Sequence, residues 1–169
     1  MNELKSLEKQ EFEKESLSWE SFDNIINKLA QEIKESFSPD VIIALFRGGS
    51  IPATYLSHLL GVRDMRPLQI KRTKSDEPEA QMIKPEIKYA ELLDEITGKN
   101  VLIVDDIADY GESLKTAQEE ILKHNPKEIK TAVLVVHQEH FNQTKDKPQI
   151  DFIGQETNKW TVFPWEKKN

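Results

Sequence analysis

The stretch VLIVDDIADYGES, residues 101–113, decides the fold of this chain. Its first four residues are apolar and predict a buried strand. Asp105 and Asp106 follow at the carboxyl end of that strand, and a helical pattern of apolar residues begins shortly afterwards, at positions 114, 117, 121 and 122. Backbone N–H groups and the dipole at the start of such a helix favour an anion. The stretch therefore predicts a site where the helix start takes a phosphate and the carboxylates take hydroxyl groups or a divalent metal.

The rest of the chain alternates helix and strand patterns. Apolar residues at helical spacing follow Ser18, the run VIIALF at 41–46 predicts a buried strand, and Pro52 suits the first turn of a helix that ends near residue 60. Shorter strands are predicted near 68–70 and at 131–136. This alternation predicts an α/β fold with a parallel central sheet flanked by helices. In such a sheet, ligands gather at the carboxyl ends of the strands.

Length and composition predict one domain. We expect an N-terminal arm at residues 1–16, followed by a single domain at 17–169. Residues 71–90 are charged, contain two prolines and show no clean period, so we expect a long flexible loop there. The net charge of −7 argues against nucleic acid as a partner. The charged N-terminus and the lack of a long apolar run predict a cytoplasmic protein with no membrane partner, and the absence of cysteine is consistent with this.

A second turn that could take part in ligand binding follows the strand predicted at 41–46. It reads Arg47-Gly48-Gly49 and leads directly into the next predicted helix. The simplest interpretation is a strand-to-helix turn in which a glycine adopts a positive φ angle. Because the acidic turn also joins a buried strand to a helix, we expect both turns to open on the same face of the sheet.

The acidic stretch resembles the phosphoribosyl-pyrophosphate (PRPP) motif of type I phosphoribosyltransferases. The acid pair, the third acid Asp109, Gly111 and Ser113 match that motif, whereas Tyr110 stands where the family usually has threonine. The resemblance implies PRPP binding by Asp105, Asp106, Ala108, Asp109, Tyr110, Gly111, Glu112 and Ser113. It also implies that Asp109 is the catalytic proton acceptor. An N-cap role is the alternative for Asp109, because aspartate caps helices well.

The glycine turn resembles the pyrophosphate-binding loop of the same family. The resemblance implies a pyrophosphate site at Arg47, Gly48, Gly49, Lys71 and Arg72. It further implies Mg²⁺ as cofactor, held by Asp105, Asp106 and Glu166. Two neighbouring carboxylates raise each other's pKa unless a cation lies between them, which agrees with a metal at this place.

The C-terminal tail resembles that of the purine branch of the family, in the xanthine–guanine and archaeal-type hypoxanthine–guanine enzymes. It reads NKWTVFPWE at residues 158–166. The resemblance implies a small base-binding hood at 150–169, in which Trp160 stacks on the purine and Thr161 lies along its edge. His137 stands at or near the place of the lysine that usually reads the purine 6-oxo group. A packed aromatic tail is the alternative interpretation.

The implied reaction is Mg²⁺-dependent transfer of a 5-phosphoribosyl group from PRPP to a nucleobase, with hypoxanthine, guanine or xanthine as first candidates. Members of the family are commonly dimers or tetramers, so we expect a homo-oligomer. One alternative is a regulatory protein of the same fold that senses PRPP or a nucleotide, suggested by Tyr110 and His137. A second is a response-regulator-like acidic pocket, in which neither the glycine turn nor the aromatic tail would have a role.

Overall fold

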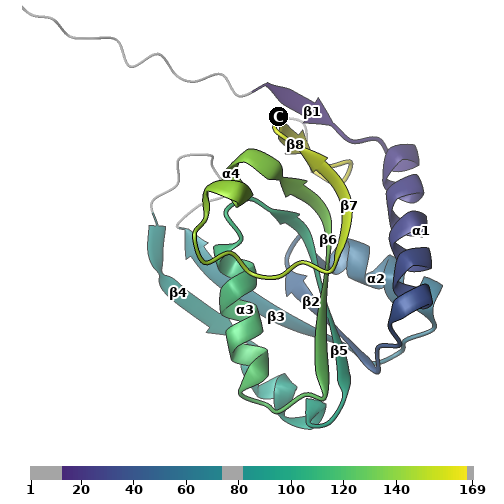
Figure 1. The fold of residues 1–169 in the computed structure, drawn as a ribbon, viewed down its shortest axis with the longest axis vertical. Coiled ribbons are helices and arrows are strands. Elements are labelled where there is room, and N and C mark those ends of the chain that lie inside the picture. Colours follow the sequence, from purple (N-terminus) through teal and green to yellow (C-terminus); the bar gives the residue numbers. More distant parts are fainter. Residues whose placement is uncertain (1–12, 74–81, 167–169) are drawn as a thin grey trace, which may run out of the picture.

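The computed structural model of the chain describes residues 13–73 and 82–166, and a six-stranded sheet forms its centre (Figure 1). The strand order is β4-β3-β2-β5-β6-β7, and every neighbouring pair is parallel except β3 and β4, which are antiparallel. The strands of this sheet are β2 (Val41–Phe46), β3 (Met65–Thr73), β4 (Met82–Lys88), β5 (Asn100–Ala108), β6 (Glu128–His137) and β7 (Phe152–Thr157). The predicted α/β fold with a mostly parallel central sheet is confirmed.

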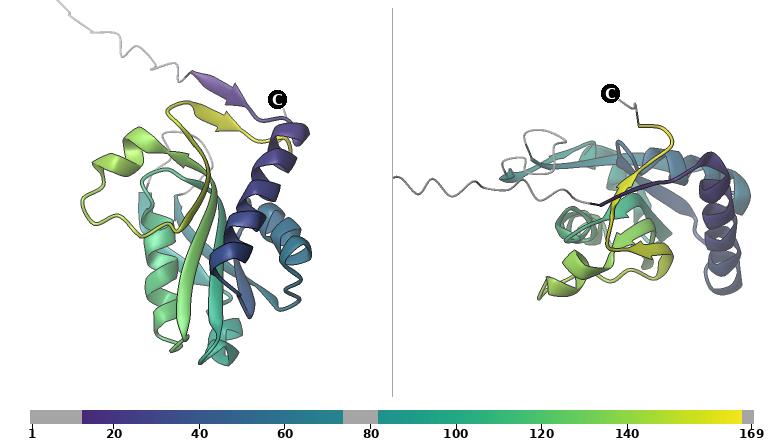
Figure 2. Two further views of the ribbon diagram at one scale, coloured as in Figure 1. Left: turned by 45° about the vertical axis from the view of Figure 1, so that its right-hand side comes forward. Right: turned by 90° about the horizontal axis from the view of Figure 1, so that it is seen from above.

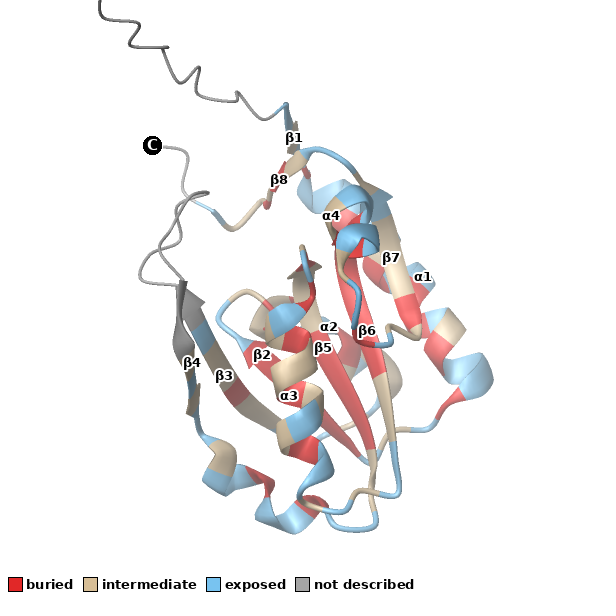
Figure 3. Ribbon diagram, turned by 60° about the vertical axis from the view of Figure 1, so that its left-hand side comes forward, coloured by how far each residue is buried: buried red, intermediate tan, exposed pale blue. Residues whose placement is uncertain are grey.

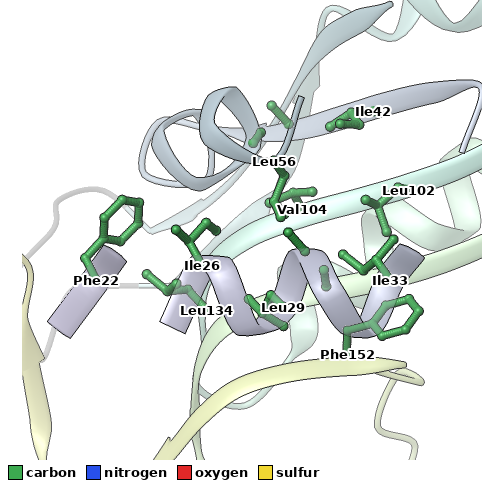
Figure 4. Close-up of a cluster of buried hydrophobic side chains, with 14 of the residues drawn as sticks. Phe22, Ile26, Leu29, Ile33, Ile42, Leu56, Leu102, Val104, Leu134 and Phe152 are labelled. Atoms are coloured by element: carbon green, nitrogen blue, oxygen red, sulfur yellow. The ribbon is translucent and has the colours of Figure 1, made fainter. Parts of the chain in front are cut away.

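Helices cover both faces of the sheet (Figures 1 and 2). The α-helices are α1 (Trp19–Ser36), α2 (Ser50–Leu60), α3 (Glu112–Leu122) and α4 (Gln138–Gln143), and η1 (Ala90–Ile96) is a 3₁₀ helix. One apolar core joins α1 and α2 to the sheet, and the residues that Figure 4 labels belong to it. The other core joins α3 and η1 to the opposite face. The interior strands β2, β5 and β6 are therefore buried along most of their length (Figure 3).

Local sequence signals fix the ends of α1. The Ser18 hydroxyl accepts a hydrogen bond from the backbone N–H of Ser21 at 3.0 Å and caps the helix start. Phe22, Ile26, Leu29, Ala30 and Ile33 form its buried stripe. The helix ends at Ser36, before Pro39, and Phe37 already has extended backbone geometry. The helix predicted from Ser18 onwards is thus confirmed.

The prediction of a long loop at residues 71–90 is wrong for most of that range. Residues 71–73 belong to β3 and residues 82–88 to β4, and Gln69 and Ile70 pair with Lys88 and Ile87 in antiparallel register. β4 is the edge strand of the sheet, and its sequence, MIKPEIK, mixes charged residues and a proline with the apolar ones, so no clean strand pattern stands out there. The part of the predicted loop at 74–81 lies outside the described residues.

Other differences from the sequence prediction are smaller. The strand predicted at 101–104 continues as β5 through the acid pair to Ala108. Leu122, which completed the apolar pattern of the following helix, is 60% exposed. Helix α4 follows β6 in a segment for which the sequence analysis predicted no helix. No helix in the described ranges is long and apolar enough to cross a membrane.

A small two-stranded sheet lies beyond the carboxyl ends of the central strands (Figures 1 and 2). It pairs β1 (Lys14–Ser16) with β8 (Trp160–Val162) in parallel. The backbone N–H of Trp160 also donates to the carbonyl of Glu13 at 2.8 Å. The end of the expected N-terminal arm therefore forms part of the same small sheet as the C-terminal tail, while residues 1–12 lie outside the described residues.

Gly154 allows α1 to pack closely on β7. A β-carbon at this position would lie 2.4 Å from Ile25 Cγ2 and 2.5 Å from the Leu134 carbonyl oxygen. We expect Gly154→Ala to destabilise the fold by about 1–3 kcal/mol, the usual cost of overpacking. Thermal unfolding measures this loss, and Glu156→Ala, an exposed position on the same strand, is the control. An unchanged melting temperature in Gly154→Ala would contradict the tight packing of α1 on β7.

Candidate active site

The turns after β2 and β5 lie side by side because these two strands are parallel neighbours. Together they line one cavity of about 350 Å³. The lining residues come from 45–48, from Ile70 of β3 and from 105–114. The prediction that both turns open on the same face of the sheet is therefore confirmed. This cavity includes Arg47, Gly48, Asp105, Asp106, Ala108, Asp109, Tyr110, Gly111, Glu112 and Ser113 from the predicted PRPP and pyrophosphate sites.

The two glycines of the first turn are required by close approach to β5. A β-carbon on Gly48 would lie 1.7 Å from Asp106 Oδ2. One on Gly49 would lie 2.4 Å from the Leu45 carbonyl oxygen and 2.8 Å from that of Val104. The peptide bond between Phe46 and Arg47 is cis, and Arg47 is exposed at the rim of the cavity. The main chain of this turn thus lies directly against the acid pair.

The acid pair forms the floor of the cavity. Asp105 Oδ1 accepts a hydrogen bond from the Asp106 backbone N–H at 2.9 Å, and Asp106 Oδ1 accepts one from the Ile107 N–H at 2.9 Å. Burial raises the pKa of Asp105 well above its usual range, and the neighbouring charge of Asp106 raises it further. Burial also raises the pKa of Asp106. In the absence of a cation, the pair therefore holds a proton up to a higher pH than an ordinary carboxyl group does.

The donor set of this pair suits a hard divalent cation. Carboxylate oxygens are the ligands that Mg²⁺ prefers, and a cation removes the electrostatic cost of holding two ionised carboxylates together. Glu166 lies close enough that its charge raises the pKa of Asp106. Its Oε2 atom accepts a hydrogen bond from the Phe163 backbone N–H at 3.0 Å. Asp105 and Asp106 could therefore hold Mg²⁺, with Glu166 as an additional negative charge nearby.

The start of α3 is open toward an anion. Gly111, at φ 76°, is the N-cap residue, and no side chain caps the helix through a hydrogen bond. A β-carbon on Gly111 would meet Phe141 and Pro148 at 2.8 and 2.9 Å, so only glycine fits this position. The N-cap interpretation of Asp109 is therefore wrong, because the cap lies two residues further on. Uncapped backbone N–H groups at a helix start are a suitable place for a phosphate.

The carboxylate of Asp109 is instead bonded to a histidine that the sequence analysis did not single out. His140 Nδ1 lies 2.5 Å from Asp109 Oδ1. The His140 ring stacks on Tyr110 at 4.7 Å between ring centroids and on His137 at 3.9 Å. Tyr110 thus packs against a histidine. A pair of histidines three residues apart at the end of β6 was the available signal, but a neighbour of Asp109 that lies 31 residues away cannot be read from spacing.

Asp109, His137 and His140 are also a possible group of metal ligands, since one ligand atom of each lies within 4.8 Å of the others. The geometry argues against one shared ion. The two imidazole planes are only 18° apart and are stacked face to face, whereas nitrogen lone pairs lie in the ring planes. Because the two ring planes are nearly parallel, the lone pairs of the two rings cannot both point at one metal ion. The group is therefore better described as a hydrogen-bonded stack.

The remaining predicted residues lie away from the lining of this cavity. His137 is only 7% exposed at the end of β6, beneath the His140 ring. Trp160 and Thr161 lie in β8, and the buried Thr161 hydroxyl has no hydrogen-bond partner among the described residues. Lys71 is exposed on β3, while the side chain of Arg72 lies outside the described part of the chain. Contacts of these side chains with a ligand stay predictions.

Comparisons with known proteins agree with this geometry. A family model described as "Phosphoribosyl transferase domain" matches residues 17–168. A hypoxanthine-guanine phosphoribosyltransferase of Schizosaccharomyces pombe is 30% identical over 83% of this chain and 82% of its own length. The crystal structure of a purine phosphoribosyltransferase from Pyrococcus horikoshii is 36% identical, with a TM-score of 0.76, and the match covers 93% of this chain and 97% of that one.

A further solved structure adds a bound nucleotide. A hypothetical protein from Neisseria gonorrhoeae, crystallised with bound ppGpp, is 25% identical to this chain, with a TM-score of 0.74. The match covers 92% of this chain and 90% of the Neisseria protein.

The raised pKa of Asp105 predicts a gain of stability in Asp105→Asn. The folded chain holds the Asp105 proton more tightly than the unfolded chain does, so native stability falls as the pH rises above the ordinary carboxyl range. Asparagine mimics the protonated acid and removes this loss. We expect a melting temperature a few degrees higher at pH 7.5, where about 1 kcal/mol corresponds to 2–4 °C.

The gain should shrink toward pH 4, where the unfolded chain also retains its proton. Asp23→Asn, at an exposed position of α1, is the matched control and should leave the melting temperature unchanged at both pH values. Asp105→Asn that is less stable than wild type at pH 7.5 would contradict this description of the acid pair.

Proposed function

The chain belongs to the phosphoribosyl transferase domain family, and we propose that it catalyses Mg²⁺-dependent transfer of the 5-phosphoribosyl group of PRPP to a purine base. The products are a nucleoside monophosphate and pyrophosphate. One observation carries the proposal: a single cavity is lined by the acid pair, the glycine turn and the uncapped start of α3. These are the groups needed for ribose hydroxyls, a diphosphate and a phosphate monoester.

The 5′-phosphate is assigned to the start of α3. Backbone N–H groups between Ala108 and Ser113, together with the Ser113 hydroxyl, can donate to its oxygens, and the helix dipole favours its charge. The ring of Tyr110 is stacked on His140, so the main chain at this position is the part available to the phosphate. The chain's overall negative charge makes such local donors necessary for an anionic substrate.

The pyrophosphate is assigned to the glycine turn. Only residues without a side chain permit the main chain at 48–49 to lie this close to β5, and the same feature permits a close approach to a diphosphate. Arg47 lies at the rim of the cavity, where its guanidinium can bind phosphate oxygens. Lys71 and Arg72 are assigned to the same ligand by family resemblance.

The ribose hydroxyls and Mg²⁺ are assigned to Asp105 and Asp106, with Glu166 as a further acid close by. When bound, Mg²⁺ neutralises negative charge that builds up on the departing pyrophosphate. The two carboxylates accept hydrogen bonds from the ribose hydroxyls and stabilise the positive charge that develops on the sugar ring. Their orientation is fixed by the backbone N–H groups of Asp106 and Ile107.

Asp109 is proposed as the proton acceptor for the purine. Its side chain is 47% exposed and lines the cavity beside the acid pair. As a bond forms between C1 of the ribose and a ring nitrogen of the base, the C1–O bond to pyrophosphate breaks and its electron pair leaves with the pyrophosphate. The proton on N7 of the purine passes to the carboxylate of Asp109, which keeps the base uncharged.

The purine is the proposed base because the named relatives are purine and hypoxanthine-guanine phosphoribosyltransferases. Hypoxanthine, guanine and xanthine are the first candidates. Trp160 is proposed to stack on the base, Thr161 to lie along its edge, and His137 to be near its 6-position. The replacement of the family's usual lysine by His137 means that the choice among these bases has to be measured.

A sensing role is the second candidate. The solved Neisseria protein has bound ppGpp, so a protein with this fold and 25% identity to this chain holds a guanine nucleotide. A regulatory protein would bind PRPP or a nucleotide with little turnover. Retention of all three acids, Asp105, Asp106 and Asp109, in one cavity favours the enzyme.

One assay distinguishes the two candidates. PRPP, Mg²⁺ and a panel of hypoxanthine, guanine, xanthine and adenine are incubated with the full chain, and pyrophosphate release is measured. The enzyme proposal predicts release that requires both Mg²⁺ and a purine. Tight PRPP or ppGpp binding without release for any base would instead support the sensing role. Size-exclusion chromatography with light scattering tests the expected homo-oligomer.

Asp109→Asn should lower kcat by about 10²–10⁴-fold, the usual contribution of a general base. PRPP affinity should change little, because the amide keeps the size of the carboxylate and leaves the start of α3 intact. Steady-state kinetics and calorimetric titration with PRPP measure these two quantities. Wild-type kcat in Asp109→Asn would remove Asp109 from the mechanism.

Trp160→Ala should weaken binding of the base or nucleotide by roughly 1–3 kcal/mol, since stacking acts on the heterocycle. PRPP binding should be nearly unchanged. Titration with each ligand, together with thermal unfolding, separates this expectation from the packed-tail alternative. Equal losses for both ligands with a lower melting temperature would show that Trp160 acts through packing.

A further inference from the structure

Three rings and one carboxylate form a continuous group next to the proposed catalytic centre. Tyr110 comes from the turn after β5, His137 is the last residue of β6, and His140 lies in α4. The rings stack in the order Tyr110, His140, His137, with centroid distances of 4.7 and 3.9 Å. His140 is therefore fixed between two rings, and its Nδ1 is directed at Asp109.

Hydrogen bonds fix which nitrogen of each histidine carries a proton. The Nδ1 atom of His137 accepts a hydrogen bond from the backbone N–H of His140 at 3.4 Å and caps the start of α4. The neutral His137 ring therefore carries its proton on Nε2. An ionised Asp109 can only accept, so the short contact from His140 requires a proton on Nδ1 of that ring.

This arrangement determines the orientation of the Asp109 carboxylate. One oxygen, Oδ1, is bonded to His140, which leaves Oδ2 for a ligand in the cavity. The Asp109 side chain, which lines the cavity, is 47% exposed, whereas that of His140 is 24% exposed, so a ligand can reach the carboxylate while the histidine is largely covered. Among the described residues, no other hydrogen bond reaches the Asp109 carboxylate oxygens, so without the His140 bond the carboxylate could rotate.

We propose that His140 is a positioning residue, which orients Asp109 toward the substrate through its Nδ1–H and is itself held in place by the ring stack. The inference rests on the proposed function of Asp109 as proton acceptor. It assigns a role to the first turn of α4 and to Tyr110, neither of which the family resemblance explains. Misplacing a catalytic group by about 1 Å can reduce turnover by as much as 10²-fold, so His140 should influence kcat without touching PRPP.

Two substitutions separate the hydrogen bond from the stack. His140→Phe retains a flat ring between Tyr110 and His137 but has no donor for Asp109. His140→Asn loses the ring but places an amide N–H near the position of Nδ1. We expect His140→Phe to lower kcat by about 10–100-fold with unchanged KM for PRPP. His140→Asn should restore most of that loss, and His58→Gln, at an exposed histidine of α2, is the control.

A spectroscopic measurement tests the same bond without turnover. Long-range ¹⁵N–¹H spectra of the imidazoles should show the Nδ1–H tautomer for His140 and the Nε2–H tautomer for His137. Asp109→Ala should shift the His140 Nδ1–H signal and leave that of His137 in place. This readout also applies if His140→Phe does not fold.

The outcomes distinguish the inference from the function on which it rests. Turnover in the wild type with an unchanged kcat in His140→Phe would overturn the positioning role and leave the enzyme proposal intact. Equal losses of kcat in both His140 variants, with parallel losses of stability, would also overturn it, because packing alone explains them. If the wild type shows no turnover with any purine, the proposed function fails, and an Nε2–H tautomer for His140 would overturn the inference independently.

Discussion

The structure depends on two adjacent carboxyl groups held at the end of a buried strand. Asp105 and Asp106 continue β5 beyond its apolar run, and burial raises the pKa of both. Such a pair is costly unless a proton, a cation or hydroxyl donors satisfy it. The glycine turn lies directly against it, because a side chain at Gly48 would occupy the position of the Asp106 carboxylate. The acid pair therefore lowers the stability of the free protein, and the same two carboxyl groups form a binding site for a polar ligand that carries a cation.

The parallel sheet explains why the other parts meet at this pair. β2 and β5 are parallel neighbours, so the turns that lead from them into α2 and α3 lie at the same end of the sheet. β6 lies on the other side of β5 and delivers His137 and α4 to the same end of the sheet. β7 then leads to β8, which pairs with β1 in the small sheet beyond the strand ends (Figure 2). The residues that line the cavity thus come mainly from the ends of β2 and β5, while β6 and β7 bring His137, α4 and the small sheet to the same end of the molecule.

The sequence predicted what depends on local pattern. The apolar runs at 41–46 and 101–104, with a glycine or acidic turn after each, were sufficient for the α/β fold and for a shared cavity. The end of β3 and the edge strand β4 could not be predicted, because the charged residues and the proline in this part of the sequence resemble a polar loop. The pairing of Asp109 with His140 could not be predicted either, because it joins residues that only the sheet brings together. The same pairing places His140 against Tyr110, which gives a structural reason for the tyrosine that stands in place of the family's usual threonine.

Calorimetric titration of the full chain with PRPP and Mg²⁺ at neutral pH tests the central claim most directly, when it is repeated in buffers that differ in ionisation enthalpy. If the buried pair keeps a proton until a cation and ribose hydroxyls replace it, binding must release protons, and the observed enthalpy must vary with the buffer. The account predicts this release in the wild type and its loss in Asp105→Asn. Binding with an enthalpy that is independent of the buffer would contradict the claim that the acid pair is the cation-dependent centre of the site.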